Sequence, residues 1–371
     1  MLQSLFLLIL MGECSFGLGR LYEYHFVQEK MTWDEAQKYC REKYTDLATV
    51  YDMKDAERLC NSVECQSGAW IGLRKKTNAN RMWQWSLPGV KFNLSEAKWK
   101  DREGRVESQE NCAAIRDGGW MDFPCNDKLP KWFVCYNETK PKRFHLIKDK
   151  KNWLDAQSYC RENHIDLLSG IKQLNDPEFI KESEALKNET EDDRTLWIGL
   201  FRDTWTWSDE KDFSFRHWDQ IPEHNDGDQV QKCATVSDGK WSSNCCSKKH
   251  PFFCYDDEVI LINESKTWEE ALDHCREHHR ELVSVTDRRQ QAWVQETARR
   301  ASTPFVWMGL RYTCTLGFWF WLTDEAVKYK NWTPGTQEED CDMSGAMETG
   351  GGHKWFKKSA RMEFNFICLR R

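Results

Sequence analysis

The sequence of 371 residues has no Cys-x-x-Cys pair, no sustained basic stripe and, beyond its first residues, no long apolar run. Without Cys-x-x-Cys spacing, its sixteen cysteines do not fit metal sites or a reduced cytosolic protein, so they predict disulfides and an oxidising compartment. No later stretch is long and apolar enough for a transmembrane helix. The net charge of −7, with acids and bases interspersed, argues against nucleic-acid binding.

Catalytic motifs are also missing. The sequence contains no Gly-x-Ser-x-Gly, His-Glu-x-x-His or P-loop motif, and its carboxylate clusters fall in segments typical of surfaces. The histidines include one adjacent pair, His278-His279, and adjacent residues on a helix point to different faces. These absences predict a protein that is not an enzyme.

The first nineteen residues have the pattern of a secretory signal peptide. An apolar run from Leu5 to Met11 is followed by small residues at Ser15, Gly17 and Gly19. The alternative is a buried N-terminal helix. Cleavage would remove Cys14 and give a soluble, secreted product, which agrees with five Asn-x-Ser/Thr sequons at Asn93, Asn137, Asn188, Asn263 and Asn331.

One pattern occurs three times along the chain. Each copy has a tryptophan seven residues before a first cysteine, then a Trp-Ile/Met-Gly-Leu run, then a last cysteine 93 to 95 residues after the first. The three sets are Trp33, Cys40, Trp70–Leu73 and Cys135; Trp153, Cys160, Trp197–Leu200 and Cys254; and Trp268, Cys275, Trp307–Leu310 and Cys368. Such self-similarity indicates one structural unit used three times.

Each copy predicts a helix together with several strands. A short β-like run precedes a helix whose start has capping-box spacing, as in Thr32 with Glu35 and Thr267 with Glu270. The Trp-Ile/Met-Gly-Leu run predicts a buried strand, and a Trp-x-Trp strand follows with both tryptophans on one face of the core. A long, irregular, polar segment comes next and suits a binding loop, because a bond between the first helix and the last strand would clamp its frame.

These motifs, together with an inner cysteine pair, resemble the C-type lectin-like domain. The resemblance covers nearly the whole chain. With three such domains in tandem, the chain is similar to the fish multi-domain members of this family. After the expected signal peptide at 1–19, this resemblance implies three tandem domains of mixed α+β fold at 20–136, 142–255 and 257–371. Each would have two helices, small antiparallel sheets, a long loop region and disulfide clamps. It also implies disulfide pairs at Cys40–Cys135, Cys112–Cys125, Cys160–Cys254, Cys233–Cys246 and Cys275–Cys368.

Sugar-binding members of the family hold calcium in the long loop with Glu-Pro-Asn or Gln-Pro-Asp and with Trp-Asn-Asp on a later strand. Calcium takes six to eight oxygen ligands, and two sugar hydroxyls can complete that shell. The first copy has Glu103-Gly104-Arg105 at the motif position and Trp120-Met121-Asp122 on the strand. Arg105 therefore places a cation where an oxygen ligand is expected, although Glu103, Arg105 and Asp122 remain candidates for ligand binding.

The second copy offers the best candidate for calcium. Its loop reads Ile221-Pro222-Glu223, and Ser242 and Ser243 replace Asn-Asp on the strand. Glu223, Asn225, Asp226 and Asp228 could form a different oxygen cage, with a solvated acidic loop as the alternative. If any copy binds a sugar, we expect it to be this one, through Glu223, Asn225 and Asp228.

The third copy has lost both parts of the calcium motif. Its loop reads Thr336-Gln337-Glu338, and Lys357 takes the place of a carboxylate ligand. The inner cysteine pair is also broken, because Ala360 stands where a cysteine is expected. We therefore expect no resident cofactor, with calcium doubtful in all three copies.

Four further cysteines lie outside the basic pattern. Cys60 and Cys65 are close enough to pair locally, and we predict that Cys314 pairs with Cys341. Removal of Cys14 leaves an odd number of cysteines, so at least one thiol is free or intermolecular. We predict that it is Cys245 and that, if exposed, it favours a disulfide-linked dimer.

Two functions compete for this chain. The first is secreted recognition of extracellular glycans or glycoproteins, supported by the family and by the avidity that three linked sites can give. The second is a calcium-independent module that binds a protein or lipid ligand, supported by Arg105, Met121, Ser243 and Lys357 at ligand positions.

Overall fold

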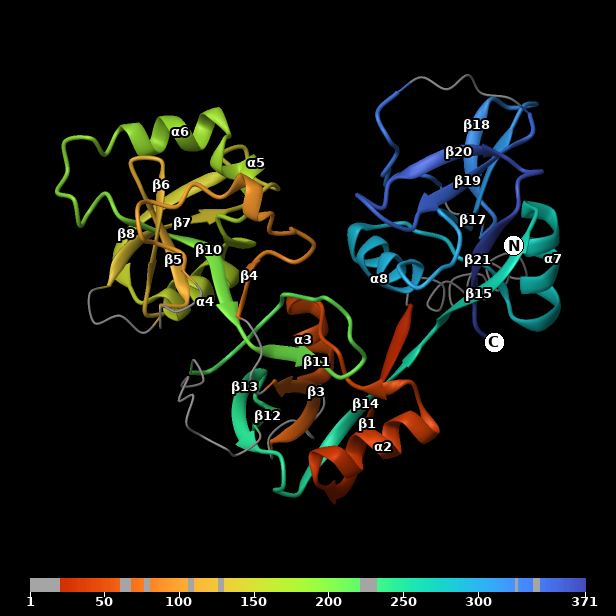
Figure 1. The fold of residues 1–371 in the computed structure, drawn as a ribbon, viewed down its shortest axis with the longest axis horizontal. Helices are drawn as coiled ribbons and strands as arrows, with labels where there is room; N and C mark the ends of the chain where they lie inside the picture. Colours follow the sequence, from red (N-terminus) through yellow and green to blue (C-terminus); the bar gives the residue numbers. More distant parts are fainter. Residues whose placement is uncertain are drawn as a thin grey trace, which may run out of the picture. The chain divides into compact units, whose positions relative to one another are not determined.

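The computed structural model describes residues 21–60, 68–76, 81–105, 110–125, 130–220, 232–323, 326–335 and 341–371. The chain forms two compact units, one made of Tyr24–Cys254 and the other mainly of Tyr255–Arg371. Three sheets of seven strands each organise them, one in the smaller unit and two in the larger (Figure 1). The expected signal peptide lies outside the described residues.

The smaller unit is the third repeat, folded on itself. Its sheet has the order β15-β21-β17-β19-β20, with β16 paired to β21 and β18 paired to β17. Its elements are β15 (Val259–Lys266), α7 (Trp268–His278), β16 (Glu281–Leu282), α8 (Arg288–Ala298), β17 (Phe305–Thr313), β18 (Phe318–Trp321), β19 (Met343–Glu348), β20 (Trp355–Ser359) and β21 (Phe364–Leu369). Most pairs are antiparallel, but β17 and β21 run parallel, so the sheet is mixed.

The larger unit contains two lobes, and each combines halves of the first two repeats. The terminal lobe consists of β1 (Tyr22–Met31), α2 (Trp33–Lys43), β2 (Asp46–Leu47), α3 (Met53–Cys60), β3 (Ala69–Lys75), β11 (Trp205–Trp207), β12 (Lys232–Ser237), β13 (Lys240–Cys245) and β14 (His250–Asp257). Its sheet has the order β1-β14-β3-β12-β13.

The central lobe is continuous in sequence. It consists of β4 (Met82–Trp85), the 3-10 helix η2 (Leu94–Glu96), β5 (Cys112–Arg116), β6 (Gly119–Phe123), β7 (Lys131–Tyr136), β8 (Phe144–Lys151), α4 (Trp153–Asn163), β9 (Asp166–Leu167), α5 (Ile171–Leu174), α6 (Pro177–Glu184) and β10 (Leu196–Asp203). Its sheet has the order β6-β5-β10-β7-β8, so strand β10 of the second repeat lies among strands of the first (Figure 1).

This exchange of halves corrects two expected disulfides. Cys40 bonds to Cys254 rather than Cys135, and Cys135 bonds to Cys160. The physical reason is that both repeats offer the same mating surfaces, so either half-domain can complete the other. The spacing along the sequence identifies the residues that pack between the two halves of a domain, but it does not show which repeat supplies each half.

The remaining expected disulfides can be compared with the described residues. The structure contains the pairs Cys112–Cys125, Cys233–Cys246, Cys275–Cys368 and Cys314–Cys341, and Cys245 is a free thiol. Cys60 is disulfide-bonded, but Cys65 lies outside the described residues, so that pair is not described.

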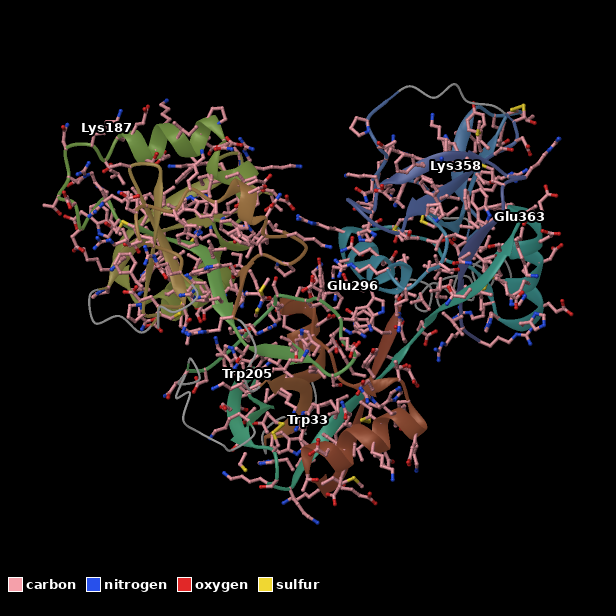
Figure 2. All side chains as sticks on the ribbon, viewed as in Figure 1. Trp33, Lys187, Trp205, Glu296, Lys358 and Glu363 are labelled. Carbon is pink, nitrogen blue, oxygen red and sulfur yellow. A yellow bond between two sulfur atoms is a disulfide. The ribbon has the colours of Figure 1, made fainter. Side chains whose placement is uncertain are left out.

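Equivalent contacts in the three cores show that the exchange preserves the fold. The first tryptophan of each helix donates its indole N–H to the carbonyl of the Ile or Met in the glycine strand: Trp33 to Ile71 (2.9 Å), Trp153 to Ile198 (2.8 Å) and Trp268 to Met308 (2.9 Å). All three tryptophans are buried, and Figure 2 shows Trp33 among the side chains of the terminal lobe. The predicted capping boxes at Thr32 and Thr267 are both present.

The exchange is also visible in the hydrogen bonds of one buried aspartate in each lobe of the larger unit. In the terminal lobe, Asp46 accepts hydrogen bonds from Arg41 and from Ser208 of the second repeat. In the central lobe, Asp166 accepts from Arg161 and from Ser86 of the first repeat. Each acid therefore meets a serine from the other repeat, at the position that follows the Trp-x-Trp strand.

Candidate functional site

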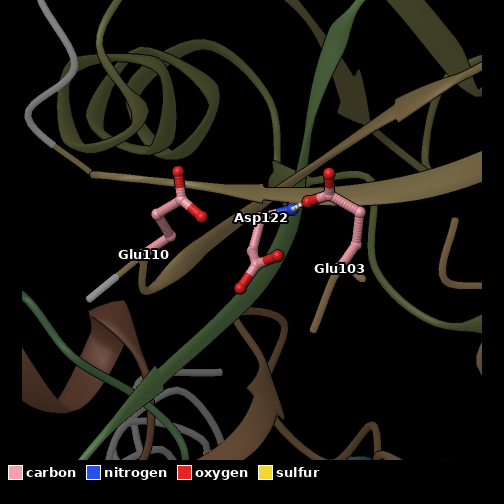
Figure 3. A group of neighbouring side chains, drawn as sticks. All are labelled: Glu103, Glu110 and Asp122. Atoms are coloured by element: carbon pink, nitrogen blue, oxygen red, sulfur yellow. Dashed lines mark hydrogen bonds between the residues drawn. The ribbon is translucent and has the colours of Figure 1, made fainter. Parts of the chain in front are cut away.

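The first repeat's loop brings its predicted residues together beside strand β6. The side chain of Glu103 accepts a hydrogen bond from the backbone N–H of Asp122 (3.1 Å), and Asp122 accepts one from the N–H of Gly104 (2.7 Å). Gly104 has φ of +72°, a backbone conformation that suits glycine. Asp122 lies between Glu103 and Glu110 in Figure 3, and ligand oxygens from all three carboxylates lie within 4.8 Å of one another.

A guanidinium that the sequence did not reveal is built into this cluster. Arg202 of β10 donates to the carboxylate of Asp122 at 3.2 Å, and both side chains are almost completely buried. Arg202 also donates to the backbone carbonyls of Arg105 and Glu110. The run Phe201-Arg202-Asp203 was visible in the sequence, but only the folded chain brings it to the loop of another repeat.

The electrostatics of the cluster are those of crowded acids. Burial raises the pKa of Glu103, and a side-chain hydrogen bond with Asp122 and the charges of Asp122 and Glu110 raise it further. The hydrogen bond from the backbone N–H of Asp122 acts in the opposite direction and lowers it. Arg105 contributes its backbone carbonyl, and its side chain is exposed. The expected cation at the motif position therefore comes from Arg202 and not from Arg105.

Calcium does not fit this donor set. Its ligands would be carboxylate and carbonyl oxygens, which attract cations. Here, however, a permanently charged guanidinium already contacts the Asp122 carboxylate and two nearby carbonyls. A second cation at the same oxygens would be repelled by the first.

The second repeat's candidates are only partly described. Ser243 on β13 lies opposite Ala234, as Asp122 lies opposite Ala113 on β6, so the register places a hydroxyl where the first repeat has a carboxylate. Ser242 is exposed, and its carbonyl accepts from Thr235 at 3.4 Å. The acidic candidates Glu223, Asn225, Asp226 and Asp228 lie outside the described residues.

The third repeat has a hollow where its loop meets β18 and β20. The pocket has a volume of about 780 Å³, within the usual range for small-molecule sites. Aromatic rings form much of its wall, and the polar side chains around it are Lys330, Thr333 and Lys357; its aromatic residues are Phe318, Trp319, Trp332, Trp355 and Phe356.

The geometry of these rings follows from the Trp-x-Trp strand. Trp321 is buried against Trp355, with ring centroids 5.4 Å apart, while Trp319 faces Trp332 at 4.8 Å. The sequence predicts core packing for both tryptophans of this strand. The inner one does belong to the core, but Trp319 is only half-buried and lines the pocket, so the prediction is wrong for the outer one. Phe318, at the start of the strand, is 48% exposed. Sequence reasoning missed this pocket because the packing of the long loop forms it.

The described residues contain no helix that is long and apolar enough to cross a membrane.

Comparison with known proteins agrees with this fold. The model of the Lectin C-type domain matches residues 29–137, 149–256 and 264–370. Human C-type mannose receptor 2 is 25% identical over 412 residues, which cover 94% of this chain and 27% of the receptor. The secretory phospholipase A2 receptor of Pongo abelii is 25% identical over 374 residues, covering 82% and 24%. The chain therefore spans about a quarter of the length of these curated relatives.

Solved structures give single-domain matches. Human lithostathine is 23% identical, with a TM-score of 0.29, over 30% of this chain and 83% of that one. The cow carbohydrate-recognition domain of CD23, solved in the presence of GlcNAc2Man3 oligosaccharide, is 24% identical, with a TM-score of 0.27, over 31% and 90%. Because the three family matches together span most of the sequence, the chain belongs to the C-type lectin family and contains three C-type lectin domains.

Proposed function

We propose that this chain is a secreted, non-catalytic recognition protein that binds glycans, and that its third repeat binds them without calcium. The observation that carries the proposal is the aromatic pocket of the third repeat. The similarity to C-type mannose receptor 2 supports a carbohydrate ligand.

The walls of the pocket suit a sugar. The apolar face of a pyranose ring packs against aromatic side chains, and its hydroxyls need donors and acceptors at the edge. Phe318 and Trp332 supply apolar faces, while the ammonium of Lys330 and the hydroxyl of Thr333 supply polar contacts. In the register of the strands, Lys357 lies opposite Gly345, where the first repeat has Asp122 opposite Ala113. A cation at that position favours recognition without a metal ion.

The second repeat remains the candidate for a calcium-linked sugar site. Glu223, Asn225, Asp226 and Asp228 offer oxygen ligands of the kind that calcium prefers. A response to calcium in glycan binding would therefore point to this repeat.

The test is a glycan-array screen of the full chain, with calcium and again with a chelator. We expect binding that persists in the chelator and falls at least tenfold in Phe318→Ala and Lys330→Ala. Leu316→Ala is the matched control, because Leu316 is 69% exposed near the same hairpin but does not line the pocket. Loss of all binding in the chelator would contradict the calcium-free site and favour the second repeat.

A protein or lipid ligand is the second candidate function. The exposed side chains of Leu316 and Phe318 put apolar surface beside the pocket, and exposed apolar surface often marks contact with macromolecules. Absence of binding to every glycan under both conditions would favour this reading.

Secretion would expose the sequons to glycosylation, and the structure separates them into two groups. Asn93, Asn188 and Asn263 are exposed. Asn137 is only 5% exposed, and the side-chain amide of Asn331 donates to the carbonyl of His353 at 3.0 Å. We infer that glycans occupy the first three sites. Mass spectrometry after enzymatic deglycosylation of the secreted protein would test this, and modification of Asn137 or Asn331 would contradict it.

A further inference from the structure

Arg202 is an arginine enclosed by the loop of a different repeat. Its side chain has no exposed surface, and its guanidinium lies 4.5 Å from the centre of the Trp83 ring. Burying a charge is costly unless partners compensate for it, so the partners of this guanidinium indicate its role.

Those partners are the acceptors that a metal ion would use. Nη2 donates to a carboxylate oxygen of Asp122 at 3.2 Å and to the carbonyl of Glu110 at 2.7 Å. Nε donates to the same carbonyl at 3.0 Å, and Nη1 donates to the carbonyl of Arg105 at 2.7 Å. One guanidinium thus ties a carboxylate on β6 to both described ends of the loop.

We propose that Arg202 is the built-in cation of this loop and does the structural work that a calcium ion does in metal-binding relatives. Carboxylate and carbonyl oxygens converge on it, and the planar fork of arginine can satisfy several of them at once. The described ends of the first repeat's loop are therefore held in place by a side chain, without calcium.

The arginine reaches this loop because of the exchange of halves. It occupies the second position after the Trp-Ile/Met-Gly-Leu run, where the first repeat has Lys75 and the third has Tyr312. A lysine ammonium is a single point of charge and lacks the fork. Among the three repeats, only the second supplies an arginine here, and the central lobe places it against Asp122.

The experiment counts calcium sites in the full chain by calorimetric titration and follows thermal unfolding. We expect the wild type and Glu103→Gln to bind the same number of calcium ions, whatever the second repeat contributes. Arg202→Met should lower the unfolding midpoint of the larger unit by about 10 °C in chelator, because it leaves Asp122 buried without its counter-ion. Calcium should restore part of that loss, and the variant should bind one more ion than the wild type.

Two further variants make the result decisive. Arg202→Met/Asp122→Asn should return to the wild-type number of ions, since the carboxylate opposite the lost charge is gone. Arg194→Met, which removes a surface pair with Asp117, should change neither the midpoint nor the stoichiometry. The proposal is overturned if Glu103→Gln loses an ion that the wild type binds, or if Arg202→Met folds and gains none. The Glu103→Gln comparison does not depend on whether Arg202→Met folds.

Discussion

The second and third repeats carry the same pattern of motifs, but their chains take different routes after the glycine strand. In the third repeat, β17 turns back into β18 through Cys314–Gly317, and Gly317 has φ of +70°. In the second repeat, β10 ends at Asp203 and β11 begins at Trp205, so the chain leaves one lobe and enters the other. One residue separates the two strands in the second repeat, and four residues separate them in the third.

The difference shows how a short connection can direct exchange. If the second repeat folded on itself with the third repeat's register, only Asp203 and Thr204 would form the hairpin loop. Two-residue hairpins need residues with positive φ, which glycine and asparagine supply and β-branched threonine does not. In the structure neither residue has positive φ. The two crossing segments meet at a hydrogen bond from the backbone N–H of Lys76 to the carbonyl of Thr204, at 2.9 Å.

The largest expected effect comes from breaking the exchanged disulfides. Cys40–Cys254 spans 214 residues, and Cys135–Cys160 spans 25. In the chain-entropy model, replacing both cysteines by serine costs about 5 kcal/mol for the long loop and about 3.5 kcal/mol for the short one. Denaturant unfolding of the two double variants measures the difference.

Chains that fold repeat by repeat would give equal costs, because each double variant would then remove one cysteine from Cys40–Cys135 and one from Cys160–Cys254 and so break both bonds. Peptide mapping of the unreduced wild type supplies the direct check. Fragments that join Cys40 to Cys135 would refute the exchange, and Cys275–Cys368 serves as the internal control.

The next largest effect is expected from low pH, which should reduce the stability of the larger unit through His217. His217 is buried, and burial lowers its pKa from 6.5 to about 3, with help from the nearby charges of Arg161 and Lys240. The unfolded state therefore binds the proton more tightly, so stability is full above pH 6.5 and is lost as the pH falls toward 3. The loss is at most about 5 kcal/mol from this group.

The third repeat suggests the matched variant. The carbonyls of His217 and Asn331 accept from Trp241 and Trp355 at equivalent places. His217→Asn should therefore flatten the acid limb of stability for the larger unit, as measured by denaturant unfolding between pH 7 and 4. An unchanged acid limb would show that His217 is not the group responsible.

A smaller effect follows from giving the third repeat the bond that the others have. Ser344 stands in the register of Cys112, and Ala360 stands where the first repeat has Cys125. Ser344→Cys/Ala360→Cys would close a short loop worth about 3 kcal/mol, less about 1 kcal/mol for the lost hydrogen bond from Arg311 to Ser344. Thermal unfolding with and without reductant measures the gain, and equal midpoints would show that the bond does not form.

The smallest effect on stability is expected at Cys245. This free thiol is partly exposed, and hydrogen bonds from Ser247 lower its pKa, which favours the reactive thiolate. Cys245→Ser should abolish a covalent dimer on non-reducing gels while leaving the unfolding midpoint unchanged. A wild type that runs only as a monomer would contradict the predicted dimer.

Most of each repeat could be predicted from the sequence. Helix caps, the buried glycine strand and the inner tryptophan of each Trp-x-Trp strand depend on neighbours a few residues away. The pairing of Cys314 with Cys341 and the free thiol of Cys245 were also predicted. The ligand sites were less predictable, because Arg202 and Glu110 join Asp122 only after the long loop packs, and the third-repeat pocket arises in the same way.

The sequence by itself determined the family, the three repeats and the residues that each core buries, because these follow from short-range patterns and hydrophobic spacing. Only the tertiary structure decided which half completes which lobe, and hence that Cys40 meets Cys254 and Arg202 meets Asp122. The physical reason is that both repeats carry the same pattern of core residues, so the pattern is compatible with either pairing. The choice between them depends on the connection between strands, which the repeated pattern does not specify.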